Sequence, residues 1–344
     1  MNYVEIKGEK YEIKEGFLDL GLLIIANISE IKGLEKIDIK HLELSSNEIQ
    51  EIKNLEHLKS LEILNLGSNS IIEISGLSKL ERLEVLHLAS NQIKEIKGLE
   101  KLVNLKELYL RGNQIEHIKG LDSLHSLKKL DLSWNAINKL QGLDSLLNLE
   151  VLWIAGNQIK KLEGLNNLSK LKVLNLAGNQ ISKIEGLDNL IELKELYLNE
   201  NLIKELKGLD SLQQLETFWI TANQIAQIQG LENCRNLQVL NLKENKITQI
   251  EGLYPLTKLN KLFLSGNKIF TIKGLETLQE LETLDLGNNQ ITKIKGLESL
   301  LNLKDLWLNN NPIDEKILNE LGGLDSSGCA IDPLKFVEYS LINL

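Results

Sequence analysis

The chain has 344 residues, a net charge of −9 at pH 7 and an isoelectric point near 5.3. This acidic balance argues against general binding to nucleic acid or to anionic membranes, and no apolar run is long enough to cross a bilayer. The 2 cysteines are no disulfide framework and fit a reducing compartment, so we expect a cytoplasmic protein.

The N-terminal residues 1–27 lie outside the regular pattern of the chain. Residues 3–13 alternate apolar and polar side chains around Gly8, which predicts a β-hairpin. We expect this segment to cover the exposed core of the first repeat. A degenerate repeat begins at Ile28, with Ala26 in the place where later repeats carry asparagine.

A 22-residue repeat governs the chain up to residue 311. Each unit contains L-x-L-x-x-N, followed by N-x-I-x-x-I-x-G-L-x-x-L-x-x-L. A fixed period of this length and composition is typical of a leucine-rich repeat solenoid. The asparagines that mark the period are Asn47, Asn69, Asn91, Asn113, Asn135, Asn157, Asn179, Asn201, Asn223, Asn245, Asn267, Asn289 and Asn311.

The repeat predicts a curved α/β solenoid over residues 28–311, with 13 full repeats and one degenerate repeat. Each L-x-L is a short strand whose leucines point inward, and the stacked strands form a parallel sheet on the concave face. The asparagine satisfies backbone groups at the turn after the strand. The L-x-x-L-x-x-L segment predicts 3-10 or single helical turns on the convex face.

Glycines recur seven residues after the asparagines, from Gly76 to Gly296, and Asn54 takes the first such place. Both residue types tolerate a positive φ, so we expect a tight left-handed turn there. Cys234 and Phe218 replace inward leucines and are predicted to be buried apolar residues.

After Asn311 the period ends. Residues 314–321 predict an amphipathic helix that Gly322 and Gly323 terminate. We interpret residues 312–344 as a C-terminal cap over the last repeat, with a partner-binding tail as the alternative.

No catalytic or metal-binding pattern occurs in the sequence. The histidines fall at different places in the repeat, and no phosphate-binding or nucleophile motif is present. His41 and His87 are interpreted as exposed bystanders on the sheet. We therefore expect no enzyme activity, no metal and no cofactor.

The predicted concave face carries an unusual share of aromatic residues. The residue four before each asparagine is aromatic in six of 13 repeats, although aromatics make up 4% of the chain. Aromatic residues suit strands, but an exposed aromatic row is typical of an interaction surface. The predicted anchors are Trp134, Trp153, Tyr197, Trp219, Phe263 and Trp307, with Tyr109 as a secondary anchor.

Acidic residues predominate on the same face, and Asp131, Glu195 and Asp285 are predicted to orient the partner. A protein partner with basic and apolar character would be complementary. Single-stranded nucleic acid would need a positive groove, which this face lacks. We expect no membrane binding and favour a monomer.

The repeat resembles that of the protein phosphatase 1 regulatory subunit 7 family, and Asn311-Pro312-Ile313 matches the turn that precedes the C-terminal cap of that family. The resemblance covers about residues 28–344 and implies a phosphatase partner on the concave face. Similar repeats occur in bacterial internalin-type surface proteins.

These patterns predict a non-catalytic scaffold that binds a protein partner on its concave face. The alternative is a regulatory subunit of an enzyme, such as a Ser/Thr protein phosphatase, which would change the turnover of its partner. An adhesin or receptor would need a secretion signal or an anchor, and the sequence shows neither.

Overall fold

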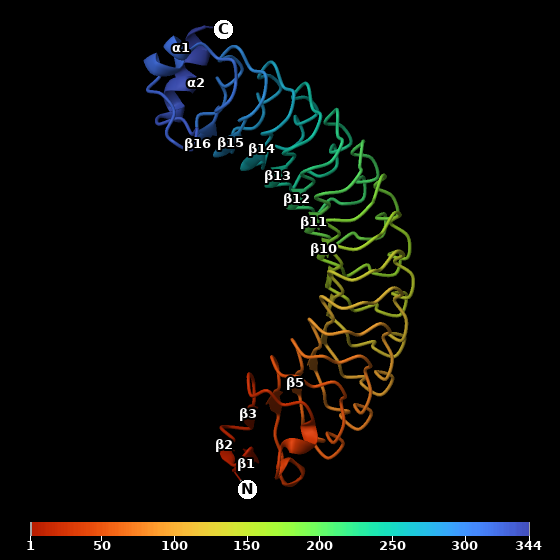
Figure 1. Ribbon diagram of the computed structural model, residues 1–344. Coiled ribbons are helices and arrows are strands. Elements are labelled where there is room, and N and C mark those ends of the chain that lie inside the picture. The colour runs from red at the N-terminus through yellow and green to blue at the C-terminus, as the bar shows by residue number, and fades with distance from the viewer. Residues whose placement is uncertain (1, 344) are drawn as a thin grey trace. The chain divides into compact units, whose positions relative to one another are not determined.

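The computed structural model describes residues 2–343. The chain forms two compact units, one made of Met1–Ile159 and Glu163–Leu171 and the other of Lys160–Leu162 and Lys172–Leu344. The predicted solenoid is confirmed in both units. Each repeat contributes one short strand to a parallel sheet, and its remaining residues form turns on the other side (Figure 1).

The first unit begins with an antiparallel hairpin, β1 (Tyr3–Ile6) and β2 (Glu9–Glu12). The 3-10 turns η1 (Ile28–Glu30) and η2 (Leu34–Lys36) follow in the first repeat. The parallel strands of this unit are β3 (Phe17–Asp19), β4 (His41–Glu43), β5 (Ile63–Asn65), β6 (Val85–His87), β7 (Glu107–Tyr109), β8 (Lys129–Asp131) and β9 (Val151–Trp153).

Strand β3 was not predicted, and the assignment of Ala26 to the asparagine position is wrong. The backbone N–H groups of Leu23 and Ile25 both donate to Asn47 Oδ1, and Asn47 Nδ2 donates to the Leu20 carbonyl. In the next repeat Asn69 makes the matching bonds to Ile49 and Leu44. Leu23 therefore occupies the asparagine position of a repeat that begins at β3.

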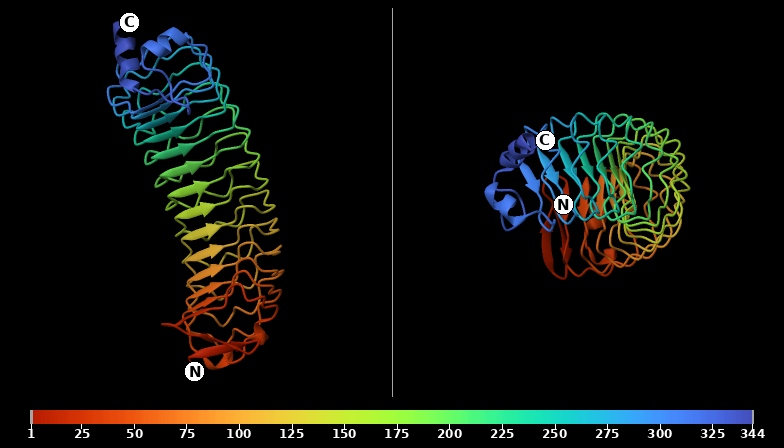
Figure 2. Two further views of the ribbon diagram at one scale, coloured as in Figure 1. Left: turned by 60° about the vertical axis from the view of Figure 1, so that its left-hand side comes forward. Right: turned by 90° about the horizontal axis from the view of Figure 1, so that it is seen from above.

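The second unit consists of further strands and two C-terminal helices. Its parallel strands are β10 (Val173–Asn175), β11 (Glu195–Tyr197), β12 (Thr217–Trp219), β13 (Val239–Asn241), β14 (Lys261–Phe263), β15 (Thr283–Asp285) and β16 (Asp305–Trp307), and its helices are α1 (Glu315–Glu320) and α2 (Pro333–Ile342). The left view of Figure 2 shows the strands of each unit side by side as parallel arrows.

In the parallel strands the middle residue is buried, and in most of them its two neighbours are partly exposed, whereas β15 is buried at all three residues. Each strand residue pairs with the residue one repeat later, as Leu86 pairs with Leu108. The stacked leucines and isoleucines form a continuous apolar column within each unit, and Phe218 and Cys234 are fully buried in it as predicted. Burial raises the pKa of the Cys234 thiol to about 12, with smaller contributions from Asp210 and Glu232.

The asparagines form the predicted hydrogen-bonded ladder. The amide Nδ2 of Asn157 donates to the carbonyls of Ile154 and Ala155 in its own turn and of Leu132 in the previous repeat. Its Oδ1 accepts from the N–H of Ile137. The side chain therefore satisfies backbone groups in two repeats and fixes their spacing.

The residue directly before each ladder asparagine has a positive φ, which the sequence did not reveal. Glycine fills this place in some repeats, but Trp134 (φ 57°), Glu200 (φ 54°) and Ala222 (φ 52°) also adopt the left-handed conformation. The turn imposes this geometry on whatever residue is present, since all 13 repeats share it.

The recurring glycines have the predicted positive φ and a second reason to be glycine. At Gly142 φ is 91°, and an added Cβ would lie 2.2 Å from the carbonyl oxygen of Ile118 in the preceding repeat. No side chain fits at that distance, so neighbouring repeats approach each other through these positions.

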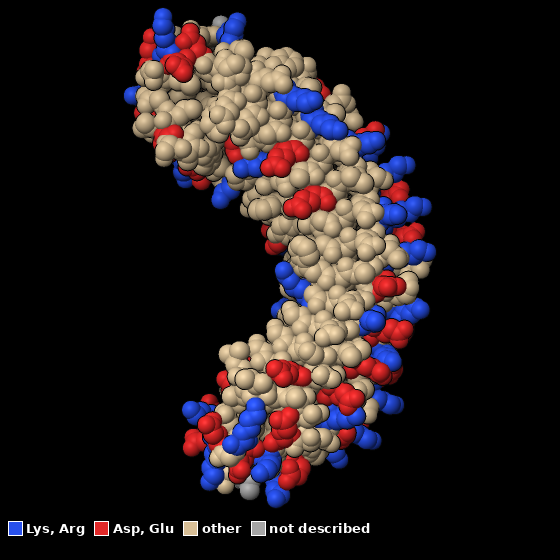
Figure 3. Space-filling view, in the orientation of Figure 1, with Lys and Arg blue, Asp and Glu red and all other residues tan. Residues whose placement is uncertain are grey.

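The convex segments contain the predicted short turns. Leu102 N–H donates to the Leu99 carbonyl and Leu105 N–H to the Leu102 carbonyl, so two consecutive three-residue turns replace a helix. In each unit, many charged side chains lie on the side of these turns in the view of Figure 3.

At the C-terminus, the predicted helix of residues 314–321 corresponds to α1, whose N-cap Asp314 accepts a hydrogen bond from Lys316 N–H. The helix α2 was not predicted. Its buried Ser340 accepts from Leu297 N–H and donates to Glu298. Residues 328–330 pair with the outer edge of β16, through Leu308 N–H to Gly328 and Ala330 N–H to Leu306.

Replacement of Asn157 by Ala should lower the free energy of unfolding by about 1–3 kcal/mol, because four backbone groups lose their hydrogen bond to the amide, although the Ala155 carbonyl keeps the one from Trp134 N–H. Asn148→Ala is the control, since Asn148 makes only two exposed bonds, to the His125 carbonyl and from Lys170 Nζ, and its loss should cost at most about 1 kcal/mol. Urea unfolding followed by circular dichroism measures both. Equal midpoints for wild type and Asn157→Ala would contradict the ladder.

Gly142→Ala should destabilise the protein by about 2–5 kcal/mol, because left-handed strain adds to the clash with Ile118. Gly112→Ala separates the two effects. Gly112 has φ 67° but its nearest neighbour would be 3.6 Å from a new Cβ, so only about 1–2 kcal/mol should be lost. Similar losses from both variants in the same unfolding assay would show that the close approach is unimportant.

Candidate functional site

The candidate surface is the outward face of the strands. We call the residues four before each ladder asparagine the aromatic column. In the first unit the column is Glu43, Asn65, His87, Tyr109, Asp131 and Trp153, and in the second it is Asn175, Tyr197, Trp219, Asn241, Phe263, Asp285 and Trp307. Each is the last residue of its strand, so the pleat holds its side chain beside the equivalent residues of the next strands.

Three rings of the first unit gather on β6, β7 and β9. The rings of His87 and Tyr109 stack with a centroid distance of 4.3 Å and an interplanar angle of 2°. The rings of Tyr109 and Trp153 lie 6.5 Å apart at 22°. Asp131 belongs to β8, the strand between those of Tyr109 and Trp153. His87 is therefore part of the cluster and not a bystander.

Glu107 holds the tyrosine of this cluster in place. The Tyr109 hydroxyl donates to Glu107 Oε2 at 2.6 Å, and Lys129 Nζ lies 2.9 Å from Glu107 Oε1. Burial and the contact with Glu107 raise the pKa of Tyr109. Burial alone would raise the pKa of Glu107, but hydrogen bonds from Tyr109 and Lys129 outweigh it and lower that pKa. Burial lowers the pKa of His87, so its ring is neutral at pH 7.

Trp134 is exposed, and its indole lies on the turn of the following repeat. Its side chain is 60% exposed, and its indole covers Gly156, where an added Cβ would come within 2.9 Å of the ring. In the described part of the chain its ring makes no contact with the ring of Trp153. Its positive φ comes from the turn and says nothing about function.

A second ring pair lies on β11 and β12 in the second unit. Tyr197 and Trp219 meet edge to face, with centroids 5.9 Å apart, and Trp219 remains 38% exposed. The Tyr197 hydroxyl donates to Glu195 Oε2 at 2.6 Å, which repeats the arrangement of Tyr109 and Glu107. Burial, followed by this contact with Glu195, raises the pKa of Tyr197 to about 12.

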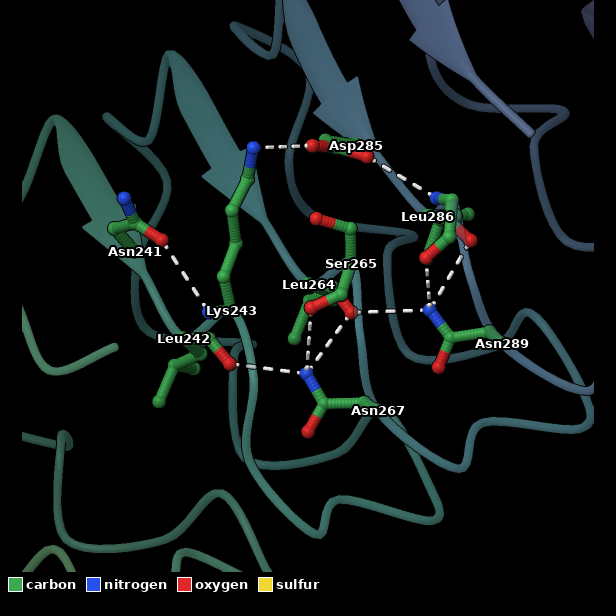
Figure 4. A network of polar contacts seen from close by, with 10 residues as sticks. Asn241, Leu242, Lys243, Leu264, Ser265, Asn267, Asp285, Leu286 and Asn289 are labelled. Carbon is green, nitrogen blue, oxygen red and sulfur yellow. Dashed lines mark hydrogen bonds and ion pairs between the residues drawn. The ribbon is translucent and has the colours of Figure 1, made fainter. Parts of the chain in front are cut away.

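An open hollow of about 390 Å³ lies farther along the second unit, over β14 to β16. Lys243 Nζ contacts Asp285 Oδ2 at 2.6 Å (Figure 4). The same ammonium lies 5.1 Å from the centroid of the Phe263 ring. The side chain of Asp285 is only 10% exposed. Trp307 and Ser327 complete the wall of the hollow. Because Asp285 is paired inside the protein, it is less available to orient a partner than the sequence suggested.

Of the predicted site residues, the structure brings together Tyr109 with Trp153, Tyr197 with Trp219 and Glu195, and Phe263 and Trp307 with Asp285. Sequence reasoning missed the parts played by His87, Glu107 and Lys243. The contact of Glu107 with Tyr109 could have been predicted, because a glutamate two residues before a tyrosine on a strand points to the same sheet face. Across residues 2–343, no cluster of three or more His, Cys, Asp or Glu residues could hold a metal ion.

A family model described as two copies of the leucine-rich repeat matches residues 81–122, 103–147, 147–189, 191–233 and 279–322. A second leucine-rich repeat model matches residues 226–269. The chain belongs to the leucine-rich repeat family. The matches follow the 22-residue period and contain no signal specific to the phosphatase regulatory subunits.

Solved leucine-rich repeat structures resemble this one. An internalin, inlF, from Listeria monocytogenes is 30% identical, with a TM-score of 0.77 over 87% of this chain and 86% of that chain. A leucine-rich repeat protein of Leptospira interrogans is 27% identical, with a TM-score of 0.68 over 88% and 92%. Internalin C2 of Listeria monocytogenes is 32% identical, with a TM-score of 0.51 over 54% and 82%.

No curated protein matches the sequence of this leucine-rich repeat chain. Leucine-rich repeats are in general interaction modules without chemistry of their own. Among residues 2–343, no helix is long and apolar enough to cross a membrane.

Glu107→Gln should lower the stability of the leucine-rich repeats by about 0.5–1.5 kcal/mol at neutral pH, the usual value of a net hydrogen bond. The folded pKa of Glu107 is below its ordinary value of 4.5, so its contribution is present above that value and disappears as the pH falls through the folded pKa. Urea midpoints from about pH 7 to about pH 3 should therefore converge for the two proteins.

The control is Glu116→Gln, because Glu116 is exposed and has no hydrogen bond or ion pair in the described chain. Its midpoint should follow wild type at every pH. A difference between wild type and Glu107→Gln that stays constant into acid would mean that the Tyr109–Glu107 contact does not depend on the carboxylate charge.

Proposed function

We propose that this protein is a non-catalytic scaffold that binds a protein partner through the outward face of its strands. The observation that supports this most directly is the aromatic column, whose rings are partly exposed yet held in place. Tyr109 and Tyr197 are each fixed by a glutamate two residues earlier, at 2.6 Å. Rings ordered before binding lose little entropy on association, which favours affinity.

The partner we propose has basic and apolar character. Tyrosine and tryptophan are the residue types that most often dominate interface energies, and Asp131 and Glu195 supply negative charge beside them. The charged turns on the other side of each unit fit a solvated surface. Aromatic anchors surrounded by acidic groups are complementary to a partner that presents lysine, arginine and apolar side chains.

We assign the repeats from β3 to residue 311 to the binding solenoid, and the hairpin β1–β2 and residues 312–344 to caps. Backbone bonds between Glu5 and Lys32 join the N-terminal hairpin to the first repeat, and the bridge between Trp307 and Cys329 covers the edge of β16. Covered edges keep strands from pairing with other chains, which agrees with a monomer. Two free cysteines fit a reducing compartment, so we propose a cytoplasmic location.

A regulatory subunit of an enzyme, such as a Ser/Thr protein phosphatase, is the second candidate. Its support is Asn311-Pro312-Ile313, which leads directly into the capped helix α1. The two proposals predict different effects on the captured partner. A scaffold leaves the turnover of a partner enzyme unchanged, whereas a regulatory subunit alters it.

The Trp153→Ala and Trp219→Ala double variant should weaken capture of the partner by about 2–4 kcal/mol per tryptophan, the range of interface hot spots. Stability should fall by only about 0.5–1.5 kcal/mol per site, from the lost ring contacts. Wild type and variant are used side by side as bait in native cytosol, captured proteins are identified by mass spectrometry, and the affinity of each is measured with purified components.

Tyr254→Ala is the matched control. Its ring is 66% exposed but lies on a turn segment, so capture should equal wild type. Proteins retained by wild type and Tyr254→Ala but lost with the double variant support the sheet face. Equal capture by all three baits would exclude the aromatic column as the working surface.

A further inference from the structure

The sequence aromatic–Asp–aromatic occurs twice in the aromatic column, once in each unit. The first copy is Tyr109, Asp131 and Trp153 on β7 to β9. The second copy is Phe263, Asp285 and Trp307 on β14 to β16, and each of its residues follows its counterpart by seven repeats. Two rings therefore flank a carboxylate on three consecutive strands in both places.

The second copy already holds a cation. The ammonium of Lys243 contacts Asp285 Oδ2 at 2.6 Å (Figure 4) and lies over the Phe263 ring, 5.1 Å from its centroid. A carboxylate as buried as that of Asp285 is costly to leave without a partner of opposite charge, and Lys243 supplies one. The face of an aromatic ring adds further attraction for a cation at this distance. The second copy therefore shows that two rings flanking an aspartate bind a cation.

The first copy has no internal cation. The counterpart of Lys243 is Ala89. Asp131 Oδ1 accepts from Ser133 N–H at 2.9 Å, and within residues 2–343 no lysine, arginine or histidine lies within ion-pair distance of its carboxylate. The nearby Lys129 is paired with Glu107.

The rings of the first copy suit a cation. A phenol that donates a hydrogen bond to a carboxylate has a more electron-rich ring, and Tyr109 donates to Glu107 at 2.6 Å. Tyr109 and Trp153 lie 6.5 Å apart at 22°, so both rings lie close to the strand that carries Asp131. The site offers two ring surfaces and one carboxylate that no lysine of this chain neutralises.

We propose that Tyr109, Asp131 and Trp153 form a subsite for an arginine side chain of the protein partner, an inference that rests on the proposed function. A guanidinium is planar and stacks on aromatic rings, and its paired N–H groups match both oxygens of a carboxylate. An ammonium is a point charge that can lie over a ring and contact a carboxylate, but it neither stacks as a plane nor matches both carboxylate oxygens. The site at Asp131 is therefore available to an arginine of the partner, whereas the related site at Asp285 is occupied by Lys243 of the same chain.

The test uses protein labelled with 5-fluorotryptophan, whose fluorine resonances are assigned with single Trp→Phe variants. N-acetyl-arginine amide is titrated into the full chain, with the neutral N-acetyl-citrulline amide as the matched probe. The Trp153 resonance should shift with arginine amide, with a dissociation constant of roughly 1 mM for so small a probe, and should stay in place with citrulline amide. The Trp307 resonance should not respond in wild type.

Three variants test the assignment. Asp131→Asn should reduce the Trp153 response at least tenfold in affinity. Its fold should persist, because Asn65, Asn175 and Asn241 occupy the same column and accept the same backbone hydrogen bond. Ala89→Lys should place a lysine as in the second copy and abolish the response. Lys243→Ala should open the second copy, so that Trp307 begins to respond to arginine amide.

A Trp153 response of equal size to citrulline amide, or no response to arginine amide, overturns the subsite. An equal response to N-acetyl-lysine amide overturns the preference for arginine. These outcomes differ from failure of the proposed function, because partner capture is measured separately with the tryptophan double variant. Loss of capture in that variant without any arginine response leaves the scaffold intact and removes only the subsite.

Discussion

The structure depends on one side-chain amide in each repeat. A ladder asparagine such as Asn157 donates to two carbonyls of its own turn and one of the previous repeat, and it accepts from an N–H of that repeat. Only an amide supplies both donors and an acceptor at this position, because a carboxylate lacks the donors and a hydroxyl lacks the reach. The bonds link each turn to the one before it, so an insertion that displaced an asparagine relative to its strand would leave buried backbone groups unpaired.

Because the ladder and the leucine column hold the repeats together, the outward strand residues add only local contacts, such as the hydrogen bond from Ser133 N–H to Asp131. The column can therefore carry aspartate, asparagine, tyrosine or tryptophan without loss of the fold. The rings are instead fixed by contacts on the face itself. Tyr109 and Tyr197 each bond to a glutamate two residues earlier on the same strand. A strand projects alternate residues to one face, so this local pair restrains the ring before any partner arrives.

The two aromatic–Asp–aromatic copies show how one substitution changes what such a face offers. Asp285 is neutralised by Lys243, which reaches it from two strands away. Asp131 has Ala89 in the corresponding place and keeps an uncompensated charge beside its rings. Two sites with the same backbone arrangement therefore differ in charge, because the ion pair depends on a long lysine side chain from a neighbouring repeat.

The sequence by itself determined the period, the parallel strands, the buried leucines, the asparagine ladder, the left-handed glycines and the first C-terminal helix. All of these follow from short-range patterns that recur at a fixed spacing. Strand β3 does not follow from the period, because Leu23 stands where the other repeats carry the ladder asparagine and because β4 begins 24 residues after β3 rather than 22. Only the tertiary structure decided that His87 stacks on Tyr109, that Trp134 covers Gly156 and that Lys243 closes on Asp285. Those contacts join residues of different repeats, and they depend on side-chain direction and reach, which the repeat pattern does not encode.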